Sequence, residues 1–175
     1  MKIHIISAST RDGRVGSGVT AWVKRQVEAA GHEAVVIDLR DHHLPFIDDA
    51  TQPAAMNKTY PHAEVQAWST VVDAAKAFIF VTPEYNHGYP GELKNAIDWL
   101  FSEWSTKPTG IVSYSGGQIA GARAAEQLKL VLSQVGCRLT QRHVALPSVR
   151  AQDGSDIADA AVGQLTPMLA DLASL

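Results

Sequence analysis

Residues suited to phosphate binding crowd the stretch SASTRDGRVGSGVTAW at positions 7–22. The stretch is rich in hydroxyl, arginine and glycine residues, and it lies where an apolar run passes into a helical pattern. Backbone N–H groups at a helix N-terminus, hydroxyl donors and guanidinium groups together favour a bound phosphate. The alternative is a plain helix cap whose arginines face solvent.

Two nucleotide-binding patterns fit this stretch incompletely. GRVGSGVT at 13–20 has the glycine spacing of a P-loop, but Val19 stands where the phosphate-binding lysine is required. GSGVTA at 16–21 meets a relaxed dinucleotide pattern with Asp38 downstream, but Gly16 comes well after the apolar run that ends at Ser7. A single terminal phosphate, such as that of FMN, suits the longer hydroxyl-rich loop better.

A second polar loop, PEYNHGYP at 83–90, follows the apolar run AFIFVT directly. Pro83 lacks an N–H donor and is expected to end the strand, while Pro90 suits the first turn of the next helix. Backbone N–H groups of this loop could serve the polar edge of a flavin, and Tyr85 offers a packing surface. Gly88 is expected to take a positive φ or to allow a close backbone approach.

A third loop, SYSGG at 113–117, places hydroxyls and paired glycines at a further turn from a strand to a helix. The glycines would let the backbone approach a flat ring closely, although a purely structural turn is the alternative. A serine-hydrolase elbow fails on spacing, because Ser113 stands where the first glycine before Ser115 is required.

The elements that must position these loops alternate along the chain. Strands are expected at 2–7, 34–39, 77–82, 109–115 and 137–146, and helices at 17–30, 63–75, 91–101, 118–135 and 155–173. Pro167 is expected to kink or split the last helix. This order predicts one α/β domain over 1–175, with a parallel sheet, helices on both faces and ligands at the carboxyl ends of the strands.

Composition excludes several classes of function. A net charge of −3 and a pI near 6.1 favour neither nucleic acid nor an anionic membrane as a partner. No apolar segment is long enough to suggest a membrane span, and a cytoplasmic protein is expected. The histidines and aspartates of DHHLPFIDD at 41–49 lack metal-ligand spacing, so no metal site is expected. The irregular stretch 41–62 suggests a lid, a binding edge or an oligomer contact.

SASTRDGR after the first strand and PEYNHGYPGELKNAIDWL after the third resemble the NADPH-dependent FMN reductase family. That family includes flavin, quinone, azo-dye and chromate reductases. The resemblance implies a flavodoxin-like three-layer sandwich with a five-stranded parallel sheet. It also implies FMN contacts from three loops, which comprise Ser9, Thr10, Arg11, Arg14, Val15, Gly16 and Ser17 around the phosphate, Pro83, Glu84, Tyr85, Asn86 and His87 near the ring, and Ser113, Tyr114, Ser115, Gly116 and Gly117 beside it.

The implied activity passes hydride from NADPH, or NADH, through FMN to a small-molecule acceptor such as a quinone, a flavin, an azo compound or a metal oxyanion. Hydride transfer to a flavin needs no acid from the protein, so no catalytic side chain is expected and Glu84 is given a structural or subunit-contact role. The resemblance also implies a homodimer or homotetramer, for which helix 91–104 and loop 41–62 are candidate contacts. Two alternatives remain: a flavodoxin-type electron carrier, and a Rossmann dinucleotide enzyme without flavin.

Overall fold

A parallel β-sheet forms the centre of the computed structural model, which describes residues 1–175. Its strand order is β2-β1-β3-β4-β5, and β6 also pairs with β4. The two middle strands, β3 and β4, are buried along their whole length, as expected for strands covered on both faces. The strands are β1 (Lys2–Ser7), β2 (Glu33–Asp38), β3 (Ala77–Pro83), β4 (Pro108–Tyr114), β5 (Arg138–Leu139) and β6 (Val144–Leu146).

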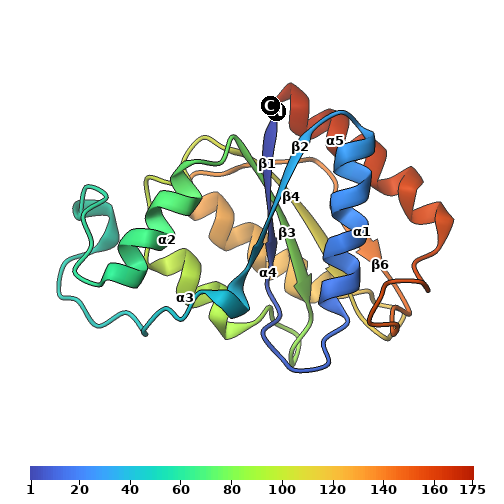
Figure 1. The fold of residues 1–175 in the computed structure, drawn as a ribbon, viewed down its shortest axis with the longest axis horizontal. Coiled ribbons are helices and arrows are strands. Elements are labelled where there is room, and N and C mark those ends of the chain that lie inside the picture. Colours follow the sequence, from blue (N-terminus) through green and yellow to red (C-terminus); the bar gives the residue numbers. More distant parts are fainter.

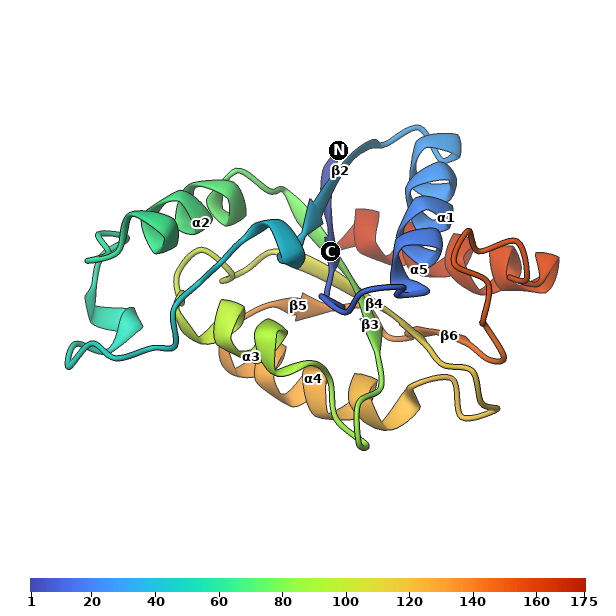
Figure 2. The ribbon, with the colours of Figure 1, turned by 60° about the horizontal axis from the view of Figure 1, so that its bottom comes forward.

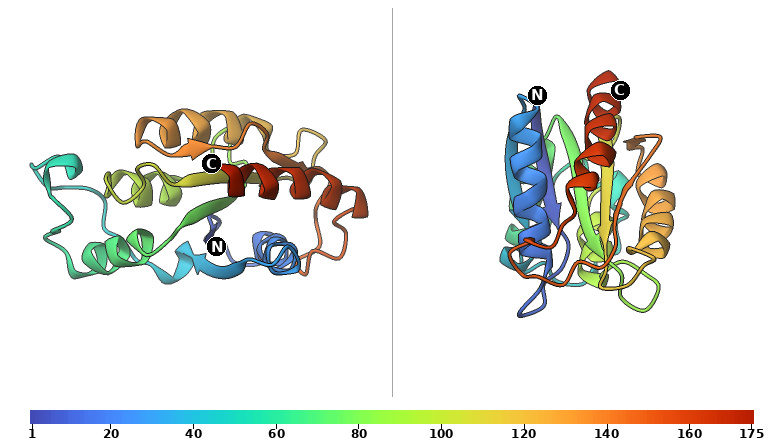
Figure 3. Two further views of the ribbon diagram at one scale, coloured as in Figure 1. Left: turned by 90° about the horizontal axis from the view of Figure 1, so that it is seen from above. Right: turned by 90° about the vertical axis from the view of Figure 1, so that its right-hand side faces the viewer.

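Five α-helices cover the two faces of the sheet, so the three expected layers are present (Figure 3). One hydrophobic cluster joins α1 and α5 to one face, and a second joins α2, α3 and α4 to the other. The helices are α1 (Gly16–Ala29), α2 (Ala63–Asp73), α3 (Gly91–Asp98), α4 (Ala122–Gln134) and α5 (Val162–Ser174). Short 3₁₀ turns lie at Leu39–Asp41, Pro53–Ala55 and Asp159–Ala161.

The expected fifth strand is divided into two short segments. Leu139 is in register with Thr109, and Val144 is in register with Val112, so residues 140–143 lie opposite only residues 110–111. The surplus residues bulge out of the sheet, where the Thr140 hydroxyl donates to the Arg142 carbonyl at 2.8 Å. Such an interruption is common at the edge of a sheet, where one side of the strand is unpaired. The sheet therefore has six strand segments rather than five.

Three expected helices have different bounds. The helix expected at 118–135 begins only at Ala122. The helix expected at 91–101 ends at Asp98 and is followed by turns, and the helix expected at 155–173 begins only at Val162. Pro167 lies inside α5 without splitting it. Its side chain is on the exposed face of the helix, where the carbonyl that loses its partner can be hydrated.

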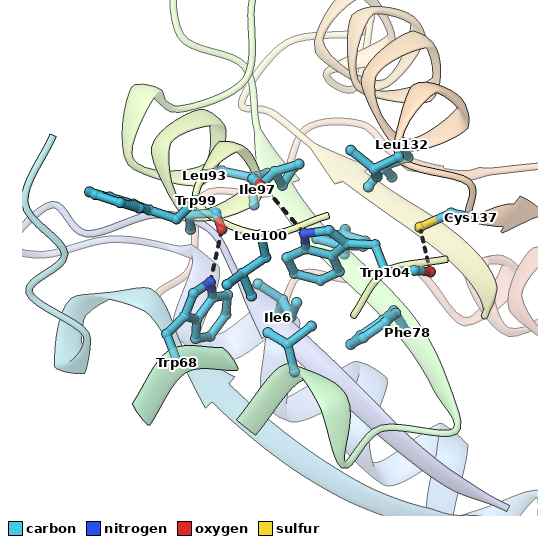
Figure 4. Packing of buried hydrophobic residues seen from close by; sticks show 14 of the residues in the cluster. Ile6, Trp68, Phe78, Leu93, Ile97, Trp99, Leu100, Trp104, Leu132 and Cys137 are labelled. Carbon is cyan, nitrogen blue, oxygen red and sulfur yellow. Dashed lines mark hydrogen bonds between the residues drawn. The ribbon is translucent and has the colours of Figure 1, made fainter. Parts of the chain in front are cut away.

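Tryptophans fill the core between the sheet and the helices α2 and α3 (Figure 4). The Trp68 indole donates to the Ala96 carbonyl at 2.8 Å, and the Trp104 indole donates to the Ile97 carbonyl at 3.1 Å. Trp99 is also fully buried. Trp99 and Trp104 therefore pack within one chain rather than between subunits. Cys137 is buried beside Trp104, and burial raises the pKa of its thiol to about 11.

The segment 41–62 leaves the sheet after β2 and projects beyond α2 and α3 (Figure 1). It is fixed at both ends. The Pro45 carbonyl accepts from Asn95 Nδ2 at 2.9 Å and from Trp99 Nε1 at 2.6 Å. At the other end, the Tyr60 hydroxyl donates to the buried Glu103 carboxylate at 2.7 Å. The N-terminal part of this segment thus has a defined position beside α3.

Candidate functional site

The loops that follow β1, β3 and β4 meet at the carboxyl end of the sheet, at the lower edge of the view in Figure 1. They enclose a cavity of about 340 Å³. Ten of its lining residues are among those expected from the sequence, namely Ser9, Arg11, Arg14, Val15, Pro83, Glu84, Tyr85, Tyr114, Ser115 and Gly116. The parallel sheet thus brings together three loops that are far apart in the chain.

The loop after β1 has a continuous run of free backbone donors. None of the N–H groups from Ser9 to Ser17 donates to an acceptor within the protein, whereas the Gly18 N–H bonds to the Val15 carbonyl at 3.1 Å. α1 begins at Gly16, so the last of these donors are the unpaired N–H groups of a helix N-terminus. This arrangement provides the donors that a phosphate group requires.

Arg14 lines the cavity and also makes bonds within the protein. Its guanidinium donates to the Ser9 carbonyl at 2.7 Å and to Ser17 Oγ at 3.0 Å, and it is ion-paired with Asp38. The side chain is only 11% exposed. These bonds hold the loop after β1 in shape and tie it to the end of β2. Arg11, in contrast, is exposed and lies over the Tyr85 ring, 5.9 Å from the ring centroid.

The loop after β3 is a tight hairpin turn. The Tyr85 N–H donates to the Gly88 carbonyl at 2.7 Å, and the Gly88 N–H donates back to the Tyr85 carbonyl at 2.9 Å. Asn86 and His87 have φ values of 51° and 69°, as in a two-residue turn with a left-handed backbone. The positive φ therefore belongs to these two residues and not to Gly88. Gly88 instead lies close to α4, where a Cβ on this residue would be 3.2 Å from Gln127 Oε1.

Glu84 connects this loop to α4. Its carboxylate accepts from the Arg123 N–H at 3.2 Å and from Arg123 Nη1 at 3.3 Å. A carboxylate at this position satisfies a free donor in the first turn of the helix and interacts favourably with its dipole. Gln127 Nε2 adds a second tie by donating to the His87 carbonyl at 3.0 Å. The structure thus supports a positioning role for Glu84.

The loop after β4 contributes both backbone and side-chain groups. Ser115 Oγ closes a small turn with Gly117, accepting from its N–H at 3.2 Å. The N–H groups of Gly116 and of Glu84, both on residues that line the cavity, have no acceptor within the protein. Tyr114 is buried with its hydroxyl directed at α1, where a Cβ on Gly16 would lie 2.3 Å from it. Burial raises the pKa of this phenol, so it stays protonated at neutral pH.

A fourth loop, at residues 147–154, completes the site and was missed from the sequence. Val149 lines the cavity, and Arg150 Nη2 donates to the Gly116 carbonyl at 2.8 Å. Gln152 Nε2 reaches the Gly13 carbonyl at 3.2 Å. The backbones of Gly18 and Gly154 are in such close contact that a Cβ on Gly18 would lie 2.3 Å from the Gly154 nitrogen. The only sequence signal was the position of this loop at the end of the last strand.

Seven expected residues do not line this cavity. Thr10 lines a neighbouring groove, and its hydroxyl donates to Glu92 Oε1 at 3.0 Å. Ser113 is fully buried in β4, where its hydroxyl has no partner. The lining also lacks Gly16, Ser17, Asn86, His87 and Gly117. Asp12 and Gly13 line the cavity without having been expected to.

The donors and surfaces of the cavity suit a flavin mononucleotide. The run of free N–H groups from Ser9 to Ser17 fits a terminal phosphate. The unpaired N–H groups of Glu84 and Gly116 fit a polar ring edge, and Tyr85 with Val149 supplies ring-sized surface. No group of three or more His, Cys, Asp or Glu side chains is placed to hold a metal ion. The helices are too short or too polar to cross a bilayer.

The sequence matches the protein family described as NADPH-dependent FMN reductase over residues 1–151. An NAD(P)H-dependent FMN reductase of Nectria sp is 34% identical over 93% of this chain and 84% of its own length. The corresponding enzyme of Saccharomyces cerevisiae is 39% identical over 75% and 73%. The quinone reductase of Escherichia coli is 42% identical over 75% and 69%.

Solved structures share the same fold. The flavoenzyme NAD(P)H:(acceptor) oxidoreductase FerB from Paracoccus denitrificans has a TM-score of 0.76 at 24% identity, covering 98% of this chain and 95% of its own. A flavodoxin from Pseudomonas aeruginosa has a TM-score of 0.59 at 20% identity, covering 99% and 97%. The expected flavodoxin-like α/β fold is confirmed.

Proposed function

This chain belongs to the NADPH-dependent FMN reductase family and is an oxidoreductase. On that premise we propose that it holds FMN in the cavity between the loops after β1, β3 and β4. We further propose that it passes reducing equivalents from NADPH or NADH to a small-molecule acceptor, of which a quinone, a flavin, an azo compound and a metal oxyanion are the candidates. Relatives named quinone reductase and azoreductase support a quinone and an azo compound as acceptors.

The observation that carries the proposal is the run of unpaired backbone donors from Ser9 to Ser17. Five residues of the run, Ser9, Thr10, Arg14, Val15 and Gly16, are buried or half-buried, and N–H groups in such positions are costly without partners, so the run indicates a ligand that supplies acceptors. The run ends at the N-terminus of α1, where the helix dipole favours an anion. A terminal phosphate satisfies both requirements at once.

When bound, FMN would supply the redox chemistry, accepting hydride from the nicotinamide and delivering electrons to the acceptor. The chain itself positions the reactants. Arg14 holds the loop after β1 against Asp38, and Glu84 holds the loop after β3 against α4. The free N–H groups of Glu84 and Gly116 would donate to the ring edge and stabilise negative charge that develops there. No acid or base of the protein is required.

The family assignment leaves the electron-carrier and Rossmann alternatives without support. The two similar FMN reductases from fungi are named for their use of NAD(P)H. The loop after β1 is longer than a Rossmann turn, since α1 begins at Gly16 while β1 ends at Ser7.

The visible spectrum of the protein tests the proposal. Purified protein reconstituted with FMN is expected to show a protein-bound flavin spectrum that bleaches on anaerobic addition of NADPH or NADH and recovers on addition of a quinone. Flavin that stays oxidised with both nucleotides would overturn the enzymatic proposal. A protein that retains no FMN on gel filtration would overturn the assignment of the cavity.

We also propose that residues 1–175 act as one domain in the cytoplasm, as a homodimer or homotetramer. Exposed apolar side chains of α4 and of the turn before it support the oligomer, since Leu130 is 75% exposed and Ile119 is 49% exposed. Light scattering during gel filtration measures the mass, and a monomer at micromolar concentration would contradict this part of the proposal.

A further inference from the structure

A second and larger groove lies beside the cavity proposed for FMN, which is called the flavin cavity below. The groove is on the other side of the loop after β1. Its volume is about 570 Å³. Thr10 lines this groove, while its neighbours Ser9 and Arg11 line the flavin cavity. The remaining wall comes from the segment after β2 and from the start of α3, which lie close together in Figure 2. A ligand that extends past residues 9–12 could therefore occupy both spaces.

Arg40 is the only permanently charged cation in this groove. It is ion-paired with Asp12, but both side chains are open to solvent, at 48% and 91% exposure. An exposed pair of this kind contributes little stability, so the guanidinium can exchange its partner for an anionic ligand. Burial lowers the pKa of His42, which is therefore mostly neutral at pH 7 and packs against Trp68 with ring centroids 5.1 Å apart.

Phe46 presents an aromatic surface at the rim of the same groove. The residue is 84% exposed, yet the chain beside it does not move freely, because the Pro45 carbonyl accepts hydrogen bonds from Asn95 and Trp99 of the α3 region. An exposed aromatic ring and a solvent-accessible guanidinium in the lining of one groove suit a base with a nearby phosphate. Glu92, the only acid in the lining, already accepts a hydrogen bond from Thr10.

We propose that this groove binds the adenosine 2′-phosphate end of NADPH, with Arg40 on the phosphate and Phe46 against the adenine. The inference rests on the proposed function, because it supposes that the nicotinamide end reaches the flavin cavity. Arg40 then determines the preference for NADPH over NADH, since only NADPH has the 2′-phosphate. Phe46 contributes to the binding of both nucleotides.

Calorimetric titration of the FMN-loaded protein with adenosine 2′-monophosphate tests the groove without any turnover. The wild type is expected to bind it more tightly than adenosine 5′-monophosphate. Arg40→Ala removes a charged hydrogen bond and should lower the affinity for adenosine 2′-monophosphate by about tenfold or more. Asp12→Asn releases Arg40 from its partner and should tighten the same nucleotide by about two- to fivefold. Phe46→Ala should weaken both nucleotides by about tenfold.

Steady-state kinetics provide the second measurement. Arg40→Ala is expected to raise the KM for NADPH and to leave the KM for NADH unchanged. Arg25→Ala is the matched control, because it removes the same charge from an exposed residue of α1 that lines neither the groove nor the flavin cavity. Thermal unfolding and FMN content show that each variant is folded and loaded.

The outcomes separate this inference from the proposed function. If the wild type oxidises NADPH but Arg40→Ala changes neither the affinity for adenosine 2′-monophosphate nor the KM for NADPH, the groove assignment is overturned and the reductase stands. Absence of adenosine 2′-monophosphate binding, for instance because a second copy of the chain covers the groove, overturns the assignment too. Binding of this nucleotide through Arg40 without any oxidation of NADPH would support the groove and contradict the reductase.

Discussion

The Tyr85 hydroxyl lies 2.7 Å from Ser9 Oγ and joins the loop after β3 to the loop after β1 at the cavity proposed for FMN. The bond links two loops that both line the cavity, so its effect should be on the ligand more than on the fold. Tyr85→Phe removes only this bond, whose net worth is about 1 kcal/mol. We expect FMN to bind about fivefold more weakly, as measured by the quenching of flavin fluorescence.

Tyr89→Phe is the control for Tyr85→Phe, since the Tyr89 hydroxyl makes no hydrogen bond within the protein and the residue does not line the cavity. Its affinity for FMN should equal that of the wild type. Equal affinities for both variants would show that the Tyr85 hydroxyl does not help to shape the cavity.

Glu84 positions α4 and is not expected to transfer protons. Glu84→Gln keeps an acceptor for the Arg123 N–H and should leave the rate of NADPH oxidation within about twofold of the wild type, with an unchanged pH profile. General acid–base catalysis contributes about 10²–10⁴-fold to a rate. A loss in that range, with one limb of the pH profile missing, would show that the carboxyl group takes part in the chemistry.

Gly16 is required because the Tyr114 hydroxyl occupies the space of its missing side chain. Gly16→Ala would place a Cβ 2.3 Å from that oxygen and 3.3 Å from Tyr114 Cζ. Such overpacking costs about 1–3 kcal/mol, and it should appear as a lower unfolding free energy in urea and weaker FMN binding. Tyr114→Phe removes the clashing oxygen and should restore most of the loss in the double variant.

Gly163→Ala serves as the control for Gly16→Ala, because a Cβ there meets nothing within 4 Å. It should stabilise α5 slightly, as alanine is favoured over glycine in a helix. If Tyr114→Phe leaves the defect of Gly16→Ala unchanged, the contact between these two residues is not its cause.

Glu103 is a fully buried carboxylate that holds three parts of the chain together. It accepts from the Tyr60 hydroxyl at 2.7 Å and from Ser69 Oγ at 2.6 Å. Glu103→Ala leaves both donors without a partner and should lower the unfolding free energy by about 3 kcal/mol. The exposed Glu64 of α2 provides the control, and Glu64→Ala should change stability by less than about 0.5 kcal/mol. Similar losses for both variants would argue against the buried network.

His4 should make the protein less stable in acid. It is buried in β1 beside Phe78, and neither ring nitrogen has a hydrogen-bond partner. Burial lowers its pKa below the ordinary value of 6.5. The unfolded chain therefore binds more protons than the folded one, so the stability from a neutral His4 is complete above pH 6.5 and is lost as the pH falls below it.

Urea unfolding at several pH values below 6.5 measures this effect. His4→Leu removes the proton that the unfolded chain binds at His4. The slope of the unfolding free energy with pH should therefore fall by up to about 1.4 kcal/mol per pH unit. The pKa values of His42 and His143 are also lowered by burial, so these two residues would keep part of the pH dependence in the His4→Leu variant. A slope that is the same in His4→Leu and the wild type would contradict the proposed protonation.

Local patterns in the sequence predict the order of the elements and the three loops that line the cavity. Apolar runs and helical spacings depend on neighbours in the chain, so strands such as 2–7 and 77–82 could be predicted to within a residue. Pro83 and Pro90 act on their own backbone and marked the ends of the loop between β3 and α3. Because parallel strands place their carboxyl ends at one edge, three separate polar loops could be assigned to one cavity.

The tertiary structure alone decided how those residues share their roles. The sequence predicts Arg14 as a phosphate contact, and the structure adds that its guanidinium also contacts Asp38 at the end of β2 and the Ser9 carbonyl. The loop at 147–154 lies at the cavity because the last strand, β6, runs beside β4. The edge strand is interrupted because residues 140–143 lie opposite only two residues of β4. Each of these outcomes depends on contacts between distant segments, whose geometry is set by packing rather than by local sequence.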